Sequence, residues 1–395
     1  MKVAGIIAEY NPFHNGHAYH IAATRAAGAT HIVVVLGGNF TQRGEPALLP
    51  KAVRTRMALA GGADLVVELP QPWSCASAEG FARGGVALLD SMGCVDFLSF
   101  GSEIGDIRPL QTAVDCIQHP AFSGLLQEAL ADGVSYAKAQ ELAVAALSDA
   151  ETAAILQQPN NTLGVEYCRA LRERNSVILP LTVRRHGAAH DAETAENDIA
   201  AAQHIRTLVQ QGKDASRFLP PDSSAILTET VKSGHALTDT ALCDRILLAV
   251  LRTVTKERFA ALPGVREGLE NRLWRVVRTA PSLDAVLCAV KTRRYTATRL
   301  RRILTAAVLD LPAGYEQRTP PYIRICGMNA RGAEILHGMK NTASLPLFSD
   351  PMCPPDDAYS KEIFRFECKV SDLYGSLLPI PLPCGQEWTT GMIRL

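Results

Sequence analysis

The stretch VAGIIAEYNPFHNGHAYH, residues 3–20, decides the fold of this chain. Its first six residues form an apolar, partly β-branched run without alternation, which is typical of a strand buried on both faces of a parallel sheet. Pro12 and Gly16 then interrupt the pattern, and residues 18–27 have helical propensity. The stretch therefore predicts a buried strand, a tight polar turn and a helix.

The turn holds an H-x-G-H tetrad, from His14 to His17, where the first helix is expected to begin. A helix N-terminus favours an anion, because its backbone N–H groups point outward and the helix dipole is positive there. Two imidazoles can add donors to the same phosphate, and Gly16 leaves room for a nucleotide to approach the backbone. The alternative is that both histidines cap the helix and bind carbonyls of the turn. Two histidines around a glycine after a buried strand favour nucleotide binding.

Further apolar runs predict buried strands that alternate with helical segments. The strands are expected at residues 31–36, 64–69, 95–100 and 177–183, and a helix at 51–60. This alternation implies right-handed crossovers and a Rossmann-like parallel sheet in an α/β fold. Ligands of such sheets collect at the carboxyl ends of the strands, so the loops after the strands are expected to meet His14 and His17.

The length of 395 residues favours two domains. The first, residues 1–220, would hold the sheet and bind the nucleotide. Within it, residues 107–157 are rich in Ala, Leu and Gln at helical spacing, which predicts a helical insertion. A proline pair and a predicted linker at 222–224 end this domain. Helical spacing then predicts a mainly α-helical second domain, residues 221–395.

Composition limits the classes of function. Lys and Arg number 40, as do Asp and Glu, so any RNA-binding surface must be a local patch. The 10 cysteines include no Cys-x-x-Cys pair, which argues against a zinc site or a disulfide scaffold, and no residue is assigned as a metal ligand. No stretch is apolar over a membrane-spanning length. A cytoplasmic protein without a membrane partner is therefore expected.

Cationic side chains follow the second predicted strand. Arg43 either contacts phosphate or pairs with Glu45 to order the turn. Lys51 and Arg54 either bind phosphate or an anionic second substrate, or they form a solvated helix face. The residue types alone do not decide between these alternatives.

Amide and guanidinium groups accompany the last predicted strand. Asn160 and Asn161 stand before a helix, where one would cap it and the other would bind a ribose or an adenine edge. Arg184 and Arg185 leave the carboxyl end of the strand, from which they can grip phosphate oxygens with paired donors. Arg206 is expected either to bind phosphate or to form a surface salt bridge.

The most positive segment is KTRRYTATRLRR, residues 291–302, which contains six basic residues and no acid. Such a segment suits contacts to RNA phosphates, with a tyrosine available to stack on a base. The alternative is a solvated helix start. The residues expected to contact RNA are Lys291, Arg293, Arg294, Tyr295, Arg299, Arg301 and Arg302.

Several of these segments resemble the tRNA(Met) cytidine acetate ligase family. They are AEYNPFHNGHAYH (8–20), NFTQRGEPALLPKAVRTRMAL (39–59), FLSFGSE (97–103), PNNTLGVEY (159–167), TVRRHGAAHD (182–191), TRRYTATRLRR (292–302) and the predicted strand PYIRICG (321–327). The H-x-G-H tetrad is shared more widely with nucleotidylyltransferases. Two positions depart from the resemblance: Gly37 stands where a serine is expected, and residues 199–206 replace hydroxyl side chains with Ala and Gln before Arg206.

The resemblance implies an ATP-dependent ligase that activates acetate as acetyl-adenylate. The acetyl group would pass to N4 of the wobble cytidine of elongator tRNA(Met), with the second domain contributing to tRNA binding and with no DNA partner. Mg²⁺ is expected to accompany the triphosphate. Two alternatives stay open: a small-molecule nucleotidylyltransferase that acts on phosphopantetheine or nicotinamide mononucleotide, and a non-catalytic protein that binds ATP and tRNA.

The resemblance also implies which residues act. His14, His17 and Arg185 would be catalytic, because they would neutralise charge as acetate attacks the α-phosphorus in line. Asn161 is preferred to Asn160 as an ATP contact, and Arg185 to Arg184, with the neighbours kept as alternatives. The ATP-binding residues implied are Ile7, Ala8, Glu9, Tyr10, Asn11, Pro12, Phe13, His14, Asn15, Gly16, His17, Ala18, Tyr19, His20, Gly101, Asn161, Arg184 and Arg185.

Overall fold

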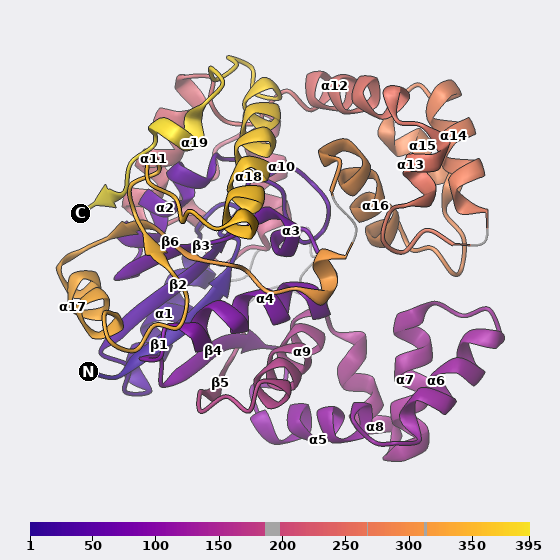
Figure 1. The fold of residues 1–395 in the computed structure, drawn as a ribbon, viewed down its shortest axis with the longest axis horizontal. Coiled ribbons are helices and arrows are strands. Elements are labelled where there is room, and N and C mark those ends of the chain that lie inside the picture. The colour runs from indigo at the N-terminus through magenta and orange to yellow at the C-terminus, as the bar shows by residue number, and fades with distance from the viewer. Residues whose placement is uncertain (186–197, 267, 312–313) are drawn as a thin grey trace.

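The computed structural model describes residues 1–395 apart from 186–197, 267 and 312–313. Its centre is a sheet in the order β5-β4-β1-β2-β3-β6-β7, with β8 also paired to β6 (Figure 1). β1 to β5 are parallel, whereas β6 runs antiparallel to β3. The strands are β1 (Val3–Ala8), β2 (His31–Gly37), β3 (Leu65–Leu69), β4 (Phe97–Ser102), β5 (Leu179–Arg184), β6 (Ile323–Met328), β7 (Leu347–Phe348) and β8 (Ile393–Arg394).

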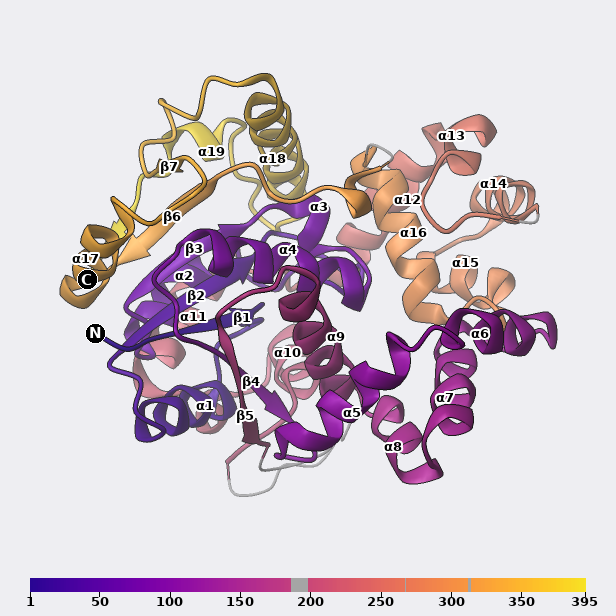
Figure 2. The ribbon, with the colours of Figure 1, turned by 60° about the horizontal axis from the view of Figure 1, so that its bottom comes forward.

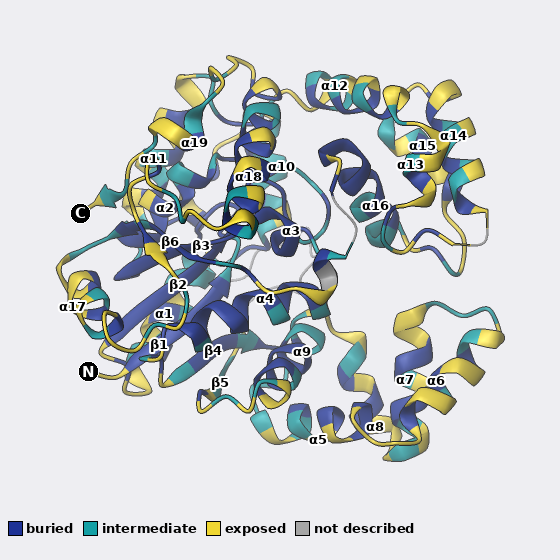
Figure 3. Ribbon diagram, viewed as in Figure 1, coloured by how far each residue is buried: buried dark blue, intermediate teal, exposed yellow. Residues whose placement is uncertain are grey.

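The inner strands are buried because their side chains alternate between two hydrophobic layers. Val33 and Val35 of β2 belong to the layer that α4 (Ala78–Ser91) covers. Ile32 and Val34 belong to the opposite layer, under α1 (Asn15–Ala26) and α2 (Lys51–Ala60). Figure 2 shows α4 and α1 on opposite sides of the sheet, and Figure 3 shows the central strands as buried. The predicted Rossmann-like α/β fold is therefore confirmed.

Element boundaries differ from the predictions where apolar residues lie outside the strands. β4 and β5 begin at Phe97 and Leu179, each two residues later than expected. Val177 precedes β5 and is 88% exposed, so this apolar side chain belongs to the connection and not to the sheet. The first helix begins at Asn15, before the expected residue 18, because His14 caps it.

The helical insertion is confirmed. It consists of α5 (Ile107–Ile117), α6 (Phe122–Ala131), α7 (Tyr136–Leu147), α8 (Ala150–Ala154) and η1 (Ile155–Gln157). It lies between β4 and α9 (Pro159–Glu173), and α9 packs against α4 and α5. In Figure 1 the pair α6 and α7 lies at the edge of the molecule, away from the sheet.

The second half of the chain is mainly helical, as expected. A linker at 222–224 is a wrong prediction, because Pro221 begins α11 (Pro221–Lys232) and Leu227 of this helix is buried in the layer under the sheet. The other helices are α3 (Gln71–Ser74), α10 (Ala202–Gln210), η2 (Ser216–Phe218), α12 (Thr240–Thr253), α13 (Lys256–Ala260), α14 (Leu269–Thr279), α15 (Leu283–Val290), α16 (Ala297–Leu309), η3 (Tyr315–Gln317), α17 (Ala330–Met339), α18 (Ala358–Ser376) and α19 (Gln386–Thr389).

The two halves of the chain share the sheet. β6, from the second half, pairs with β3, so the C-terminal residues extend the sheet of the first half. The division of domains at residue 220 stays a prediction. A search of the described residues finds no helix with the length and apolarity that crossing a membrane requires.

Candidate functional site

The turn after β1 places His14 at the N-cap of α1. His14 Nδ1 accepts a hydrogen bond from the backbone N–H of Gly16 at 3.1 Å, and His17 Nδ1 accepts one from the backbone N–H of His14 at 3.2 Å. The two rings stack with their centroids 3.7 Å apart. This reciprocal arrangement is a capping box, so the capping alternative is observed. Gly16 is required by the cap itself, because a Cβ there would lie 2.9 Å from Cε1 of His14.

The cap determines which ring nitrogen of each imidazole can donate a hydrogen bond. A ring nitrogen that accepts from a backbone N–H is unprotonated, so the proton of a neutral His14 or His17 lies on Nε2. Burial and the neighbouring positive charges of His14 and Arg185 hold the pKa of His17 well below its usual range, which keeps this ring neutral. Capping and phosphate binding are therefore compatible, because Nδ1 serves the helix while Nε2–H is the donor.

A pocket lies where the strand order reverses. From β1 the chain runs through β2 and β3 on one side and returns to β4 and β5 on the other, and open α/β sheets bind ligands at such a point. The pocket is lined by the turn after β1, by the ends of β4 and β5 and by the segment before α10. The lining residues are His14, Gly16, His17, Tyr19, His20, Gly101, Val183, Arg184, Arg185, Ile199, Ala200 and Ala201.

The ends of β4 and β5 meet the two histidines as expected, whereas the described lining of the pocket includes no residue from the loops after β2 and β3. Gly101, Arg184 and Arg185 share the pocket with the histidines. Residues 186–191 of the TVRRHGAAHD segment lie outside the described residues. Asn161 is not among the residues that line the pocket in the described part of the chain, so its predicted ATP contact depends on a different argument.

His20 adds an acceptor to the pocket. Its Nε2 lies 2.9 Å from Oγ of Ser99, this Oγ lies 2.7 Å from Oγ1 of Thr24, and Thr24 donates to the His20 carbonyl at 2.8 Å. Since the Thr24 proton goes to the carbonyl, Ser99 donates to Thr24 and accepts from His20 Nε2–H. Nδ1 of His20 is then unprotonated. Burial, with the positive charge of Arg185, lowers the pKa of His20 to about 4, so this tautomer persists at neutral pH.

The asparagine pair fixes the loop after β4. α9 begins at Pro159 with Gln158 as its N-cap, so the prediction that an asparagine caps this helix is wrong. Asn161 is 2% exposed, and its Oδ1 accepts from the backbone N–H groups of Glu103 at 2.9 Å and Ile104 at 3.2 Å. In return, the Glu103 carboxylate accepts from the backbone N–H of Asn161 at 2.7 Å and from the Asn160 side chain at 2.6 Å. The carboxylate therefore occupies the N-terminus of α9.

Comparisons with known proteins agree with this geometry. A family model described as HIGH Nucleotidyl Transferase matches residues 1–384. The tRNA(Met) cytidine acetate ligase of Acetivibrio thermocellus is 36% identical over 416 residues, which cover 100% of both chains. The protein of the same name from Caldicellulosiruptor saccharolyticus is 40% identical over 383 residues, which cover 95% of this chain and 94% of that relative.

The chain belongs to the tRNA(Met) cytidine acetate ligase family. Solved structures agree with this assignment. The apo crystal structure of Thermotoga maritima TmcAL gives a TM-score of 0.95 at 31% identity, with 100% of both chains covered. The structure of the same protein bound with alpha-thio ATP gives a TM-score of 0.91 at 30% identity, also with 100% of both chains covered.

In this member of the ligase family, Arg54 does not face solvent. It is fully buried, and its guanidinium donates to the carbonyls of Leu49 at 3.0 Å, Glu9 at 2.7 Å and Gly37 at 3.0 Å. Both predicted alternatives for Arg54, a phosphate contact and a solvated helix face, are therefore wrong. The side chain instead holds the loops after β1 and β2 together.

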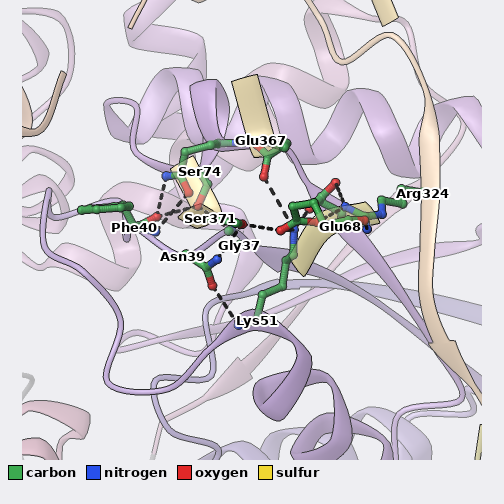
Figure 4. A network of polar contacts seen from close by, with 12 residues as sticks. Gly37, Asn39, Phe40, Lys51, Glu68, Ser74, Arg324, Glu367 and Ser371 are labelled. Carbon is green, nitrogen blue, oxygen red and sulfur yellow. Dashed lines mark hydrogen bonds and ion pairs between the residues drawn. The ribbon is translucent and has the colours of Figure 1, made fainter. Parts of the chain in front are cut away.

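Lys51 is also buried, so the same two alternatives are wrong for it. Its Nζ forms ion pairs with Glu68 of β3, with Glu367 of α18 at 3.6 Å and with Glu387 of α19 at 2.9 Å (Figure 4). Arg324 of β6 adds a second cation to this cluster through Glu68 and Glu387. Two cations face three carboxylates, and burial raises the pKa of Glu367 to about 8, so this carboxyl is mostly protonated at neutral pH and the other four charges compensate. The cluster joins residues that are far apart in the sequence.

The two departures from the ligase-family pattern have local explanations. A Cβ at Gly37 would lie 3.0 Å from Oγ of Ser74, so a hydroxyl is already beside this position. Arg206 donates to the carbonyl of Asn11 at 3.0 Å and to the side chain of Gln203. Arg206 therefore supports the turn that carries His14, and its predicted phosphate contact stays a prediction.

The basic segment of 291–302 is divided between loop and helix. Thr296 caps α16, and Tyr295 is 7% exposed with its hydroxyl donating to the carbonyl of Arg266 at 3.0 Å. The guanidinium of Arg299 lies 4.7 Å from the centre of the Tyr295 ring. Tyr295 is therefore not available to stack on a base in this conformation. Lys291 and Arg293 are exposed, whereas Arg301 pairs with Glu45 at 3.1 Å.

Two residues of the site were missed from the sequence. Ser99 fixes the tautomer of His20, and Glu103 fixes the loop beside Gly101. Both lie in the FLSFGSE segment, whose sequence predicts a strand, a glycine beside the ligand and a family resemblance but no role for these two side chains. Polar residues that end a buried strand are the signal that points to them.

Proposed function

We propose that this chain is an ATP-dependent ligase that activates acetate as acetyl-adenylate and acetylates N4 of the wobble cytidine of elongator tRNA(Met). The observation that carries the proposal is the pocket at the strand reversal, where the capped histidine pair meets Arg185. The likeness to the alpha-thio ATP complex of Thermotoga maritima TmcAL supports ATP as the nucleotide. The relatives' names support acetate and tRNA(Met) as the other substrates.

The proposed reaction has two steps. A carboxylate oxygen of acetate attacks the α-phosphorus of ATP in line, and the bond from this phosphorus to the bridging oxygen breaks as pyrophosphate leaves. Nε2–H of His14 and His17 and the guanidinium of Arg185 stabilise the developing negative charge. The cytidine N4 amine then attacks the acetyl carbon, AMP leaves and N4 loses a proton.

ATP contact is assigned to residues 7–20, Gly101, Asn161, Arg184 and Arg185. Asn161 is proposed to act through the loop it holds, because its amide is bonded to the backbone of Glu103 and Ile104. None of the described residues that line the pocket is acidic, which gives no protein carboxylate for Mg²⁺. Mg²⁺ that accompanies ATP would be held by phosphate oxygens and water.

Contact with tRNA is assigned to the basic residues of the 291–302 segment, of which Lys291 and Arg293 are exposed. The residues proposed are Lys291, Arg293, Arg294, Arg299, Arg301 and Arg302; Tyr295 is withdrawn because of its burial. A tRNA substrate supports a location in the cytoplasm, which is part of this proposal.

The test is an acetylation reaction with purified protein, ATP, acetate and tRNA. Mass spectrometry of the digested tRNA should detect N4-acetylcytidine only when ATP and acetate are both present. Pyrophosphate exchange into ATP that needs no acetate would favour a small-molecule nucleotidylyltransferase. Tight tRNA binding with unmodified cytidine would favour a non-catalytic binder.

A further inference from the structure

A cleft separates the helical insertion from the C-terminal helices. It has a volume of about 520 Å³, within the range of ligand pockets, and its walls come from α6, α7, the loop before α14 and the start of α16. A second hollow of about 420 Å³ continues it along α14, since Arg294 and Tyr295 line both. We call the two together the arginine cleft. Figures 1 and 2 both show α6 facing the helices of the second half.

All charged residues among the described residues that line the arginine cleft are positive. It includes Arg266, Arg272, Arg293, Arg294 and Arg299, and the described lining residues include no carboxylate. Residue 267, a glutamate in the sequence, lies outside the described residues. Five guanidinium groups along one groove suit a phosphate backbone, because each can give paired donors to phosphate oxygens.

Three of these arginines are held in place by the protein, and one of them, Arg272, donates to the carbonyl of Ala289. Arg299 donates to the carbonyl of Gly264 at 2.9 Å and lies over the Tyr295 ring. Arg294 donates to the carbonyl of Leu130 at 3.2 Å and so connects the basic segment to α6. The orientation of these groups is therefore set before a ligand arrives, which reduces the entropy lost on binding.

The insertion provides the opposite, apolar wall. Leu126, Leu130 and Ala131 of α6 line it together with Tyr136, the first residue of α7. The Tyr136 side chain is 45% exposed, whereas Tyr295 across the cleft is 7% exposed. An exposed aromatic ring beside ordered cations is the combination that binds an unstacked nucleobase and its phosphates.

We propose that the helical insertion forms one wall of an RNA-binding cleft, in which Tyr136 stacks on a base and Arg266, Arg272 and Arg293 contact the backbone. This inference rests on the proposed function, because the RNA is taken to be the tRNA substrate. It assigns a role to the insertion and extends the RNA surface beyond residues 291–302. The occupant is a strand of RNA, since phosphates suit the arginines and a base suits the tyrosine.

The first test reverses charge at two cleft arginines outside residues 291–302, with Arg266→Glu combined with Arg272→Glu. The KM for tRNA in the acetylation reaction should rise at least tenfold, and the salt dependence of tRNA affinity should weaken by a slope of about 1 to 2. Acetate-dependent pyrophosphate exchange without tRNA should stay unchanged. The matched control is Arg331→Glu with Arg365→Glu, two exposed arginines of α17 and α18.

The second test concerns the aromatic ring of Tyr136. Tyr136→Ala should raise the KM for tRNA about fivefold or more, and Tyr136→Phe should keep the wild-type value. Ultraviolet crosslinking of wild-type protein to tRNA should mark the peptide that contains Tyr136. If the charge-reversal pair fails to fold, the neutral pair Arg266→Gln with Arg272→Gln replaces it.

The outcomes separate this inference from the proposed function. Wild-type protein that fails to acetylate tRNA contradicts the proposed function. Wild-type protein that acetylates tRNA, with an unchanged KM in the charge-reversal pair and in Tyr136→Ala, overturns the arginine cleft alone. Crosslinks confined to the sheet would overturn it as well.

Discussion

The N-termini of α1 and α9 lie at the same edge of the sheet but differ in what fills them. At α1, two histidines satisfy the backbone through Nδ1, which leaves Nε2–H groups as donors beside the pocket. At α9, the Glu103 carboxylate already supplies the negative charge that a helix N-terminus favours. The comparison indicates that the α1 N-terminus keeps donors for a phosphate, whereas the α9 N-terminus is already filled by a carboxylate.

Of the changes considered, removing one histidine from the N-terminal cap of α1 should reduce activity the most. His17→Ala deletes a cap acceptor and a proposed phosphate donor, and loss of one such donor costs about 10²–10³ in kcat. We expect acetate-dependent pyrophosphate exchange to fall by this factor, while tRNA affinity stays the same. His337→Ala, on the exposed face of α17, is the control. An equal loss of tRNA affinity in His17→Ala would show that the two surfaces are not separate.

Acidic pH should lower the stability of the protein through His20, a residue of α1. The pKa of His20 is lowered to about 4, so the folded protein binds fewer protons than the unfolded chain below about pH 6.5. The stability from this ring is present above pH 6.5 and is lost as the pH falls toward 4, by at most about 1.4 kcal/mol per pH unit. Denaturant unfolding at pH 7 and pH 5 measures it. Wild type should lose more stability than His20→Gln; an equal loss in both would contradict the assignment.

Gly16→Ala tests the geometry of the α1 cap without removing a donor. The added Cβ would lie 2.9 Å from the His14 ring and would push it aside, so we expect pyrophosphate exchange to slow about tenfold, or roughly 1.4 kcal/mol. Alanine is the better helix former, so the free energy of unfolding should change by less than about 1 kcal/mol. A parallel loss of stability would mean that the variant acts through the fold instead.

Removing the carboxylate from the N-terminus of α9 should have the smallest effect on the protein. The change should also turn this helix N-terminus into a site that binds an anion. Glu103→Ala removes the carboxylate, which should lower stability by about 1 kcal/mol. Added inorganic phosphate should then raise the Tm of Glu103→Ala more than that of wild type. Glu103→Gln, which keeps an acceptor without the charge, should respond less than Glu103→Ala. Identical phosphate responses in wild type and Glu103→Ala would contradict the comparison.

The sequence predicted the elements that local pattern controls. β1 matched its predicted range, because a run of apolar residues buried on both faces has a pattern that no surface strand shares. The turn with His14 and His17 could be recognised because strand, tetrad and helix are adjacent in the chain. Their convergence with Arg185 followed from the general geometry of parallel sheets.

The sequence could not reveal partners that only the tertiary fold supplies. Lys51 looked like a solvated cation, and its burial depends on Glu387, which lies far away in the chain. One asparagine of the pair Asn160 and Asn161 was expected to cap a helix, but the N–H groups that Asn161 binds belong to the loop after β4. The sequence suggested that Tyr295 could stack on a base, but the structure buries its side chain.

The cluster around Lys51 has a consequence for biosynthesis. Lys51 and Glu68 are made early, but Arg324, Glu367 and Glu387 leave the ribosome only near the end of translation. A fragment that ends at residue 220 would contain Lys51 and Glu68. It would lack Arg324, Glu367 and Glu387. The nucleotide-binding sheet is therefore expected to reach its final packing only after the last helices have been synthesised.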